Sequence, residues 1–133
     1  MRMNYKVCSM LALLVCASAN CVAANHTVQV GQSGLTFSPA TTSIASGDTI
    51  TFVNSNTGGL AHNVVSDDGG TTFSSGAPMS GPWTFTTGPI TNKIAFHCTV
   101  HGTAGPGGGV AGTGMAGSIN LTVPVTLQSF EVN

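Results

Sequence analysis

Four side chains are candidate ligands for a soft or borderline metal ion: His62, Cys98, His101 and Met115. Cys98 and His101 stand three residues apart in the segment FHCTVH, residues 96–101. A thiolate, two imidazoles and a thioether form a donor set that selects copper. Two histidines and one cysteine with a weak axial methionine give the blue-copper type of site. The residue types therefore predict a site for one copper ion.

The start of the chain predicts a secretory signal peptide, residues 1–24. A positively charged beginning, an apolar run and small residues indicate cleavage before Asn25, with a second cleavage position after Ala19. Removing residues 1–24 leaves Cys98 as the last of four cysteines. An exported protein with one cysteine cannot form an internal disulfide, and a free thiol is open to oxidation there. A metal is a leading reason for keeping this thiol.

The remaining residues, 25–133, suit a single domain with one hydrophobic core. Their charge is sparse, since Lys93 is the only basic residue apart from the histidines. Without a basic patch, nucleic acid is not an expected partner. No later apolar run is long enough to span a bilayer, so no membrane insertion is expected after signal removal. We expect an exported monomer, in the periplasm or fully secreted.

The mature chain alternates short β-like runs with turn clusters and shows no helical periodicity. This pattern predicts an all-β, antiparallel Greek-key sandwich of about seven to nine strands. The expected strands are residues 26–30, 35–39, 41–45, 48–54, 62–66, 83–87, 92–98 and 118–123, with 126–132 as a further one. Alternation along 92–98 puts Cys98 on the same face as Ile94 and Phe96, with His97 on the opposite face.

Two segments of the mature chain are irregular. Residues 54–61 form a polar, glycine-containing loop directly before His62. Residues 102–114 contain seven glycines in thirteen positions, which predicts a long flexible loop between His101 and Met115.

The order of these segments resembles that of the cupredoxins, the small type 1 blue copper proteins of the plastocyanin and pseudoazurin group. The resemblance extends from Leu35 to Val123. A C-x-x-H pair alone is a weak signal, whereas the ordered set is specific. The matching segments are FSPATTSIASGDTITFVN (37–54), HNVVS (62–66), FHCTVH (96–101) and GMAGSI (114–119).

The resemblance implies that His62, Cys98 and His101 are equatorial copper ligands and that Met115 is the axial ligand. It also implies that Asn63 ties the two ligand loops together through its side chain. In relatives the methionine follows the second histidine after about four residues, whereas here thirteen intervene. Because GMAGSI keeps the local pattern, we interpret residues 102–114 as an insertion in an intact site.

The function implied by the resemblance is one-electron transfer by a type 1 copper cycling between Cu(I) and Cu(II). Four protein ligands leave no position for a substrate, so no catalysis is expected. Redox partner proteins are expected to dock at the exposed edge of His101, beside the 102–114 insertion. The alternative is a copper carrier or buffer without a dedicated electron-transfer role, and a metal-free interaction module is a third reading.

Three other side chains offer competing roles. Met79 is the rival axial ligand, although no local motif surrounds it. His97 points away from Cys98, and by analogy with the family it would lie on an electron path to the surface. His26 would serve a copper oxygenase site only after cleavage behind Asn25, where asparagine is a poor residue.

Overall fold

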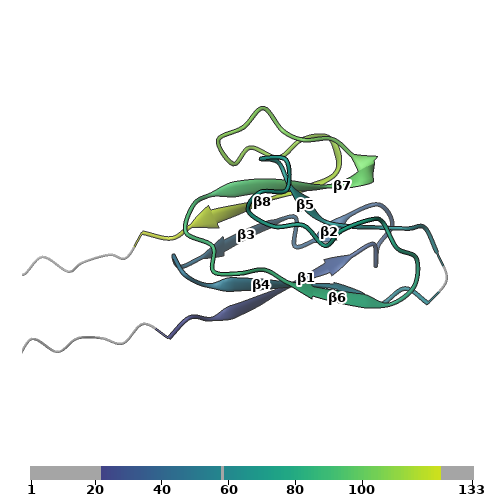
Figure 1. The fold of residues 1–133 in the computed structure, drawn as a ribbon, viewed down its shortest axis with the longest axis horizontal. Coiled ribbons are helices and arrows are strands. Elements are labelled where there is room, and N and C mark those ends of the chain that lie inside the picture. Colours follow the sequence, from purple (N-terminus) through teal and green to yellow (C-terminus); the bar gives the residue numbers. More distant parts are fainter. Residues whose placement is uncertain (1–21, 58, 124–133) are drawn as a thin grey trace, which may run out of the picture.

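The structure is a computed structural model that describes residues 22–57 and 59–123. Within these residues the chain forms two four-stranded sheets, ordered β2-β1-β4-β6 and β3-β8-β7-β5, which lie one above the other (Figure 1). The prediction of an all-β sandwich of seven to nine strands is confirmed. The strands are β1 (Asn25–Val30), β2 (Phe37–Ser38), β3 (Thr41–Ile44), β4 (Thr49–Asn54), β5 (Val65–Ser66), β6 (Trp83–Thr86), β7 (Ile94–Gly102) and β8 (Gly114–Leu121).

Two of the strand pairs are parallel, so the sheets of the sandwich are mixed, whereas the sequence predicted an antiparallel sandwich. β1 runs parallel to β4, and β3 runs parallel to β8, while the other pairs are antiparallel. Parallel strands need a long crossover connection. Here the chain passes through the opposite sheet between the two parallel strands of each pair: β3 lies between β1 and β4 along the chain, and β4 and β6 lie between β3 and β8. Among the described residues, no helix is long and apolar enough to cross a membrane.

A cluster of aromatic rings fills the core between the sheets. Phe96 of β7 is fully buried and meets Phe37 and Phe52 edge to face, with ring centroids 4.9 and 5.1 Å apart. Phe73 borders the same ring. Gly117 of β8 leaves the space that Phe96 occupies, because a Cβ at position 117 would collide with the ring. Each ring buried in this way contributes about 1.5–3 kcal/mol.

The two strands that carry Cys98, His101 and Met115 are longer than predicted. β7 continues through His101 to Gly102, and β8 begins at Gly114 instead of residue 118. Gly102 and Gly114 face each other in the ladder, after a register irregularity that follows His97. A side chain on Gly102 would overlap the Met115 backbone, so glycine is what allows the pairing to extend this far.

Other expected strands differ at their ends. Of residues 62–66 only Val65 and Ser66 form a strand, while His62 makes an isolated bridge to Met79. The predicted strand 126–132 and nearly all of the predicted signal peptide lie outside the described residues.

The 102–114 loop has a defined path over the sandwich. Thr103 and Thr113 pair across its base through an N–H to O=C bond of 3.0 Å and through their hydroxyls. Farther along, Gly109 packs against the aliphatic stem of Lys93, at the other end of β7. Figure 1 shows this loop folded back over β7, on the side away from the other sheet. The loop therefore covers the outer face of β7.

Candidate metal centre

Three candidate ligands from two distant parts of the chain meet at one end of the sandwich. The Cys98 sulfur lies 3.9 Å from Nδ1 of His62 and 3.6 Å from Nδ1 of His101. The two imidazole centroids are 4.8 Å apart. His62 and Cys98 are buried, whereas His101 is partly exposed. One thiol and two imidazole nitrogens thus point into one small space.

These separations fit ligands of a single metal ion. With metal–sulfur and metal–nitrogen bonds of about 2.3 and 2.0 Å, sulfur and nitrogen atoms at trigonal or tetrahedral angles lie roughly 3.5–3.7 Å apart. The observed distances of 3.6 and 3.9 Å are at or just above that range. Hence only small side-chain movements are needed to bring the three atoms to bonding distance.

Backbone pairing holds the two segments that carry the candidate ligands. Cys98 and His101 belong to β7, within the stretch where the register with β8 shifts. His62 comes from a separate segment, and its N–H and C=O both pair with Met79 at 3.0 Å. Hydrogen bonds to β8 and to Met79 therefore hold the two backbone segments from which the donor side chains project.

Asn63 links these two segments through its side chain. Its Oδ1 accepts hydrogen bonds from the backbone N–H of Thr99, at 2.9 Å, and from the Thr99 hydroxyl, at 3.1 Å. Its Nδ2 donates to the Gly76 carbonyl at 2.9 Å. The residue after His62 is therefore bonded to the residue after Cys98, which is the link that the sequence resemblance implied.

The electrostatic setting keeps His62 in the form that binds metals. Burial of the imidazole, and secondly the charge of His101, lower the pKa of His62 below its usual value. A neutral imidazole is the ligand form, since a proton on the coordinating nitrogen must leave before a metal binds.

The two methionines lie in contrasting environments. Met115 is fully buried at the start of β8, where that strand pairs with the end of β7. Met79 pairs with His62 through its backbone, but the residue is 48% exposed. Burial and its place beside the end of β7 favour Met115 over Met79 as a fourth ligand.

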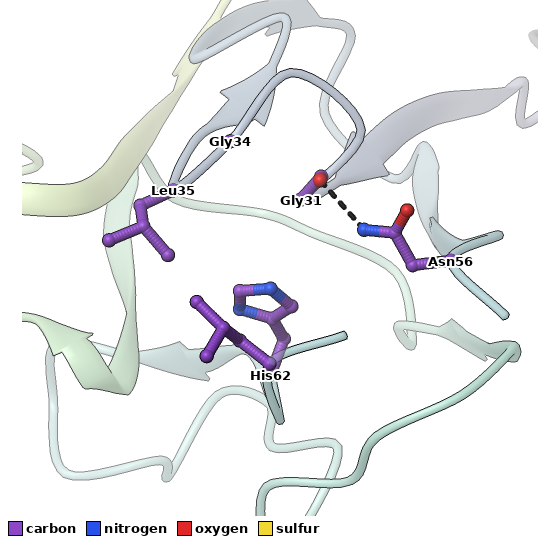
Figure 2. A pocket seen from close by; sticks show the side chains of 6 residues that line it. Gly31, Gly34, Leu35, Asn56 and His62 are labelled. Carbon is purple, nitrogen blue, oxygen red and sulfur yellow. Dashed lines mark hydrogen bonds between the residues drawn. The ribbon is translucent and has the colours of Figure 1, made fainter. Parts of the chain in front are cut away.

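A shallow surface pocket of about 220 Å³ lies beside His62. Figure 2 shows the imidazole pointing into the space between Leu35 and Gly31, where Asn56 donates a hydrogen bond to the Gly31 carbonyl. A Cβ on Gly31 would lie only 2.7 Å from Nε2 of His62. Sequence reasoning missed Gly31, because nothing in the sequence separates it from the other turn glycines.

The remaining two histidines lie outside this cluster. Nδ1 of His97 donates a 2.6 Å hydrogen bond to Oδ1 of Asp67, on the face of β7 opposite Cys98 as predicted. His26 donates from Nε2 to Asp48 at 2.8 Å, where β1 and β4 begin. Asp67 and Asp48, both buried carboxylates, were not singled out by the sequence.

Solved structures of similar fold include several copper proteins. A purple cupredoxin from Nitrosopumilus maritimus matches with a TM-score of 0.51 and 18% identity, covering 73% of this chain and 99% of that one. A mutant plastocyanin of fern matches with a TM-score of 0.50 and 19% identity, covering 72% of this chain and 99% of that one. The Cu-containing nitrite reductase of Thermus scotoductus SA-01 matches at 0.53 and 19% over 76% of this chain. This chain spans only 23% of that reductase. At these identities the likeness shows the fold.

Sequence comparison gives the family. No curated protein matches the chain significantly. The family model for copper binding proteins of the plastocyanin/azurin family matches residues 24–122. This match covers most of the sequence and confirms the resemblance found from its motifs. The chain therefore belongs to the plastocyanin/azurin family of copper-binding proteins, and its cofactor is a type 1 copper ion.

Proposed function

We propose that this protein is an exported one-electron carrier whose copper is held by His62, Cys98 and His101, with Met115 in the axial position. The observation that carries the proposal is the convergence of the Cys98 sulfur with two Nδ1 atoms, at 3.9 and 3.6 Å. When bound, the copper supplies the Cu(I)/Cu(II) couple. The protein supplies soft thiolate and thioether donors that favour Cu(I) in an apolar pocket.

Rigid placement of the donors suits this role. Cys98, His62 and Met115 are almost fully buried, and strands or backbone bridges hold all three. If the ligands need not move when the copper changes charge, the structural reorganisation that accompanies electron transfer stays small. Packing and the Asn63 bonds to Thr99 support this rigidity.

The proposal includes no catalytic step. Four protein ligands would fill the coordination positions and leave none for a substrate, unlike catalytic metal sites that keep an open position. The nitrite reductase match does not argue for an enzyme, because it shows fold alone.

Cupredoxins in general interact with redox partner proteins, and we propose that partners of this one dock around His101. Of His62, Cys98 and His101, only His101 is partly exposed. Val100, the preceding residue, is 57% exposed and adds apolar surface at the same end of β7. The base of the 102–114 loop, residues 102–104 and 112–114, flanks this surface, while the middle of the loop lies over β7.

The test is visible absorption spectroscopy of the protein with Cu(II), beside a Cys98→Ser variant. An intense charge-transfer band in the blue to green range that disappears in the variant supports the thiolate site. Reversible oxidation and reduction without copper loss supports electron transfer. Copper that passes readily to an acceptor protein during cycling favours the copper carrier instead. Pale solutions of both proteins would contradict the proposal.

Export also belongs to the proposal, with the signal peptide removed and the periplasm as the expected location. Ala24 bears on the cleavage site, because its N–H donates to Asp48 and its carbonyl accepts from the Thr49 N–H. Cleavage before Asn25 would remove both bonds, whereas cleavage after Ala19 would keep them. The intact mass of the exported protein distinguishes the two positions.

A further inference from the structure

We propose that Asp67 is a positioning residue for the copper site, a role that rests on the proposed electron-transfer function. Its carboxylate bridges the strand that carries Cys98 and the loop that joins His101 to Met115. Oδ1 accepts from Nδ1 of His97, and Oδ2 accepts from the backbone N–H of Gly105, both at 2.6 Å. One buried side chain thus holds two parts of the ligand framework together.

The carboxylate is well enclosed. The Asp67 side chain is 4% exposed and the His97 side chain 15%. The Asp67 backbone is also fixed, because its N–H donates to the Ala95 carbonyl at 2.9 Å, just beyond the pairing of β5 with β7. Hydrogen bonds to an ionised carboxylate are stronger than hydrogen bonds between neutral groups. Removing the carboxylate also leaves two donors without a partner, which lowers the free energy of unfolding.

The two partners of Asp67 lie close to the ligands along the chain. His97 directly precedes Cys98, and Gly105 is four residues after His101. Gly105 itself is tightly placed, since a Cβ there would overlap the Val110 carbonyl on the returning half of the loop. Fixing Gly105 therefore fixes both halves of the loop.

The covered face of β7 agrees with this role. Ala95 is only 1% exposed although it shares the outer face with His97. Gly109 rests on the stem of Lys93, on the same face. Figure 1 shows β5 beside β7 and the loop lying over them. In this arrangement Asp67 lies at the contact between the loop and β7. Its hydrogen bonds restrict the motion of the long insertion, which would otherwise displace His101 or Met115.

The test uses Asp67→Ala and Asp67→Asn, with Asp68→Ala as the matched control. The Asp68 carboxylate accepts only from its own turn, from Ser66, Thr71 and Thr72, and does not contact the loop. Amide hydrogen exchange is measured at residues 103–113 in the metal-free protein. Losing a charged hydrogen bond from the closed loop predicts exchange faster by about tenfold to a hundredfold in Asp67→Ala. Asp67→Asn keeps one acceptor oxygen and should lie between.

The copper-loaded variants provide the second measurement. We expect Asp67→Ala to shift the thiolate-to-copper band and to slow electron self-exchange, while Asp68→Ala leaves both unchanged. Loop exchange that stays within about twofold of the original protein, or that rises equally in Asp68→Ala, overturns the proposal. A freed loop with an unchanged band overturns the link to the copper site. If Asp67→Ala does not fold, Asp67→Asn answers the same questions.

The two proposals fail in distinguishable ways. Absence of a charge-transfer band in the unsubstituted protein would remove the electron-transfer function. The exchange experiment needs no copper, so it would still report whether Asp67 holds the loop.

Discussion

The backbone of Gly31 packs directly against the imidazole of His62. A Cβ built on Gly31 would lie 2.7 Å from Nε2 and 2.9 Å from Cδ2 of that ring. Gly31 also has a φ of +69°, which favours glycine over any other residue. The residue that follows β1 therefore limits the position of the His62 ring, one of the proposed copper ligands.

Gly31→Ala is expected to displace His62 and to change the copper spectrum. The strained backbone adds a destabilisation of about 1–3 kcal/mol. Gly34→Ala is the matched control, because Gly34 has a φ of +95° but nothing within 4 Å of its Cβ position. Both variants should lower the free energy of unfolding, measured in urea, while only Gly31→Ala shifts the absorption band. Equal spectra for the two variants would contradict the role given to Gly31.

Asn63→Ala is expected to loosen the copper site. The substitution removes the acceptor for two Thr99 donors, and because Thr99 is exposed these donors can bond to water instead, so each lost hydrogen bond costs about 0.5–1.5 kcal/mol. Copper should be lost faster to a chelator, as followed by the decay of the visible band. Thr99→Val removes only the hydroxyl bond, so its effect should be smaller. A larger effect from Thr99→Val would show that the link does not act through the backbone N–H.

The variants Met115→Leu and Met79→Leu test which of the two methionines binds copper. If Met115 is the axial ligand, its replacement raises the reduction potential, because Cu(II) loses more than Cu(I) when a donor leaves a buried site. The folding cost should stay below about 1.5 kcal/mol, since the two side chains have similar volumes. Met79 is exposed, so Met79→Leu should change neither potential nor spectrum. The reverse pattern in voltammetry would identify Met79 as the ligand.

Asp48 predicts how stability depends on pH. The hydrogen bond from His26, and next the N–H of Ala24, hold the pKa of Asp48 below its usual 3.8. The folded state thus favours the ionised carboxylate, whose contribution is complete above the unfolded pKa and is lost as pH falls through the lower, folded value. In urea titrations from pH 7 to 2, Asp48→Asn should be less stable at neutral pH and less sensitive to acid below about pH 3.8. An unchanged acid profile would contradict this prediction.

The sequence predicted best what depends on residue type and alternation. Cys98 was predicted to face inward and His97 outward, and a period of two along a strand is enough to settle that. The meeting of His62, Cys98 and His101 followed from the ordered motifs, and the structure brings these three together.

What the sequence could not predict depends on contacts made across the fold. The glycines of 102–114 suggested a loop beginning at Gly102, but backbone pairing continues there because a glycine lets two strands approach closely. Asp67 and Asp68 stand next to each other before two glycines, and nothing in the sequence distinguishes their surroundings. In the structure Asp68 caps a turn, whereas the Asp67 side chain is buried because the loop folds over it, and the path of the loop has no local signal.

The parallel pairing of β3 with β8 has a kinetic consequence. Thr41 bonds to Ser118 through their hydroxyls, 77 residues apart in sequence, so this edge of the sheet forms only when nearly the whole domain is available for folding. Pairings between such distant segments slow folding. Until β8 pairs, the inner strand β7 lacks one of its two neighbours, and Cys98 lacks part of the core that buries it. The thiol should therefore remain accessible to alkylating reagents until late in folding, and a chain ending before β8 should not protect it.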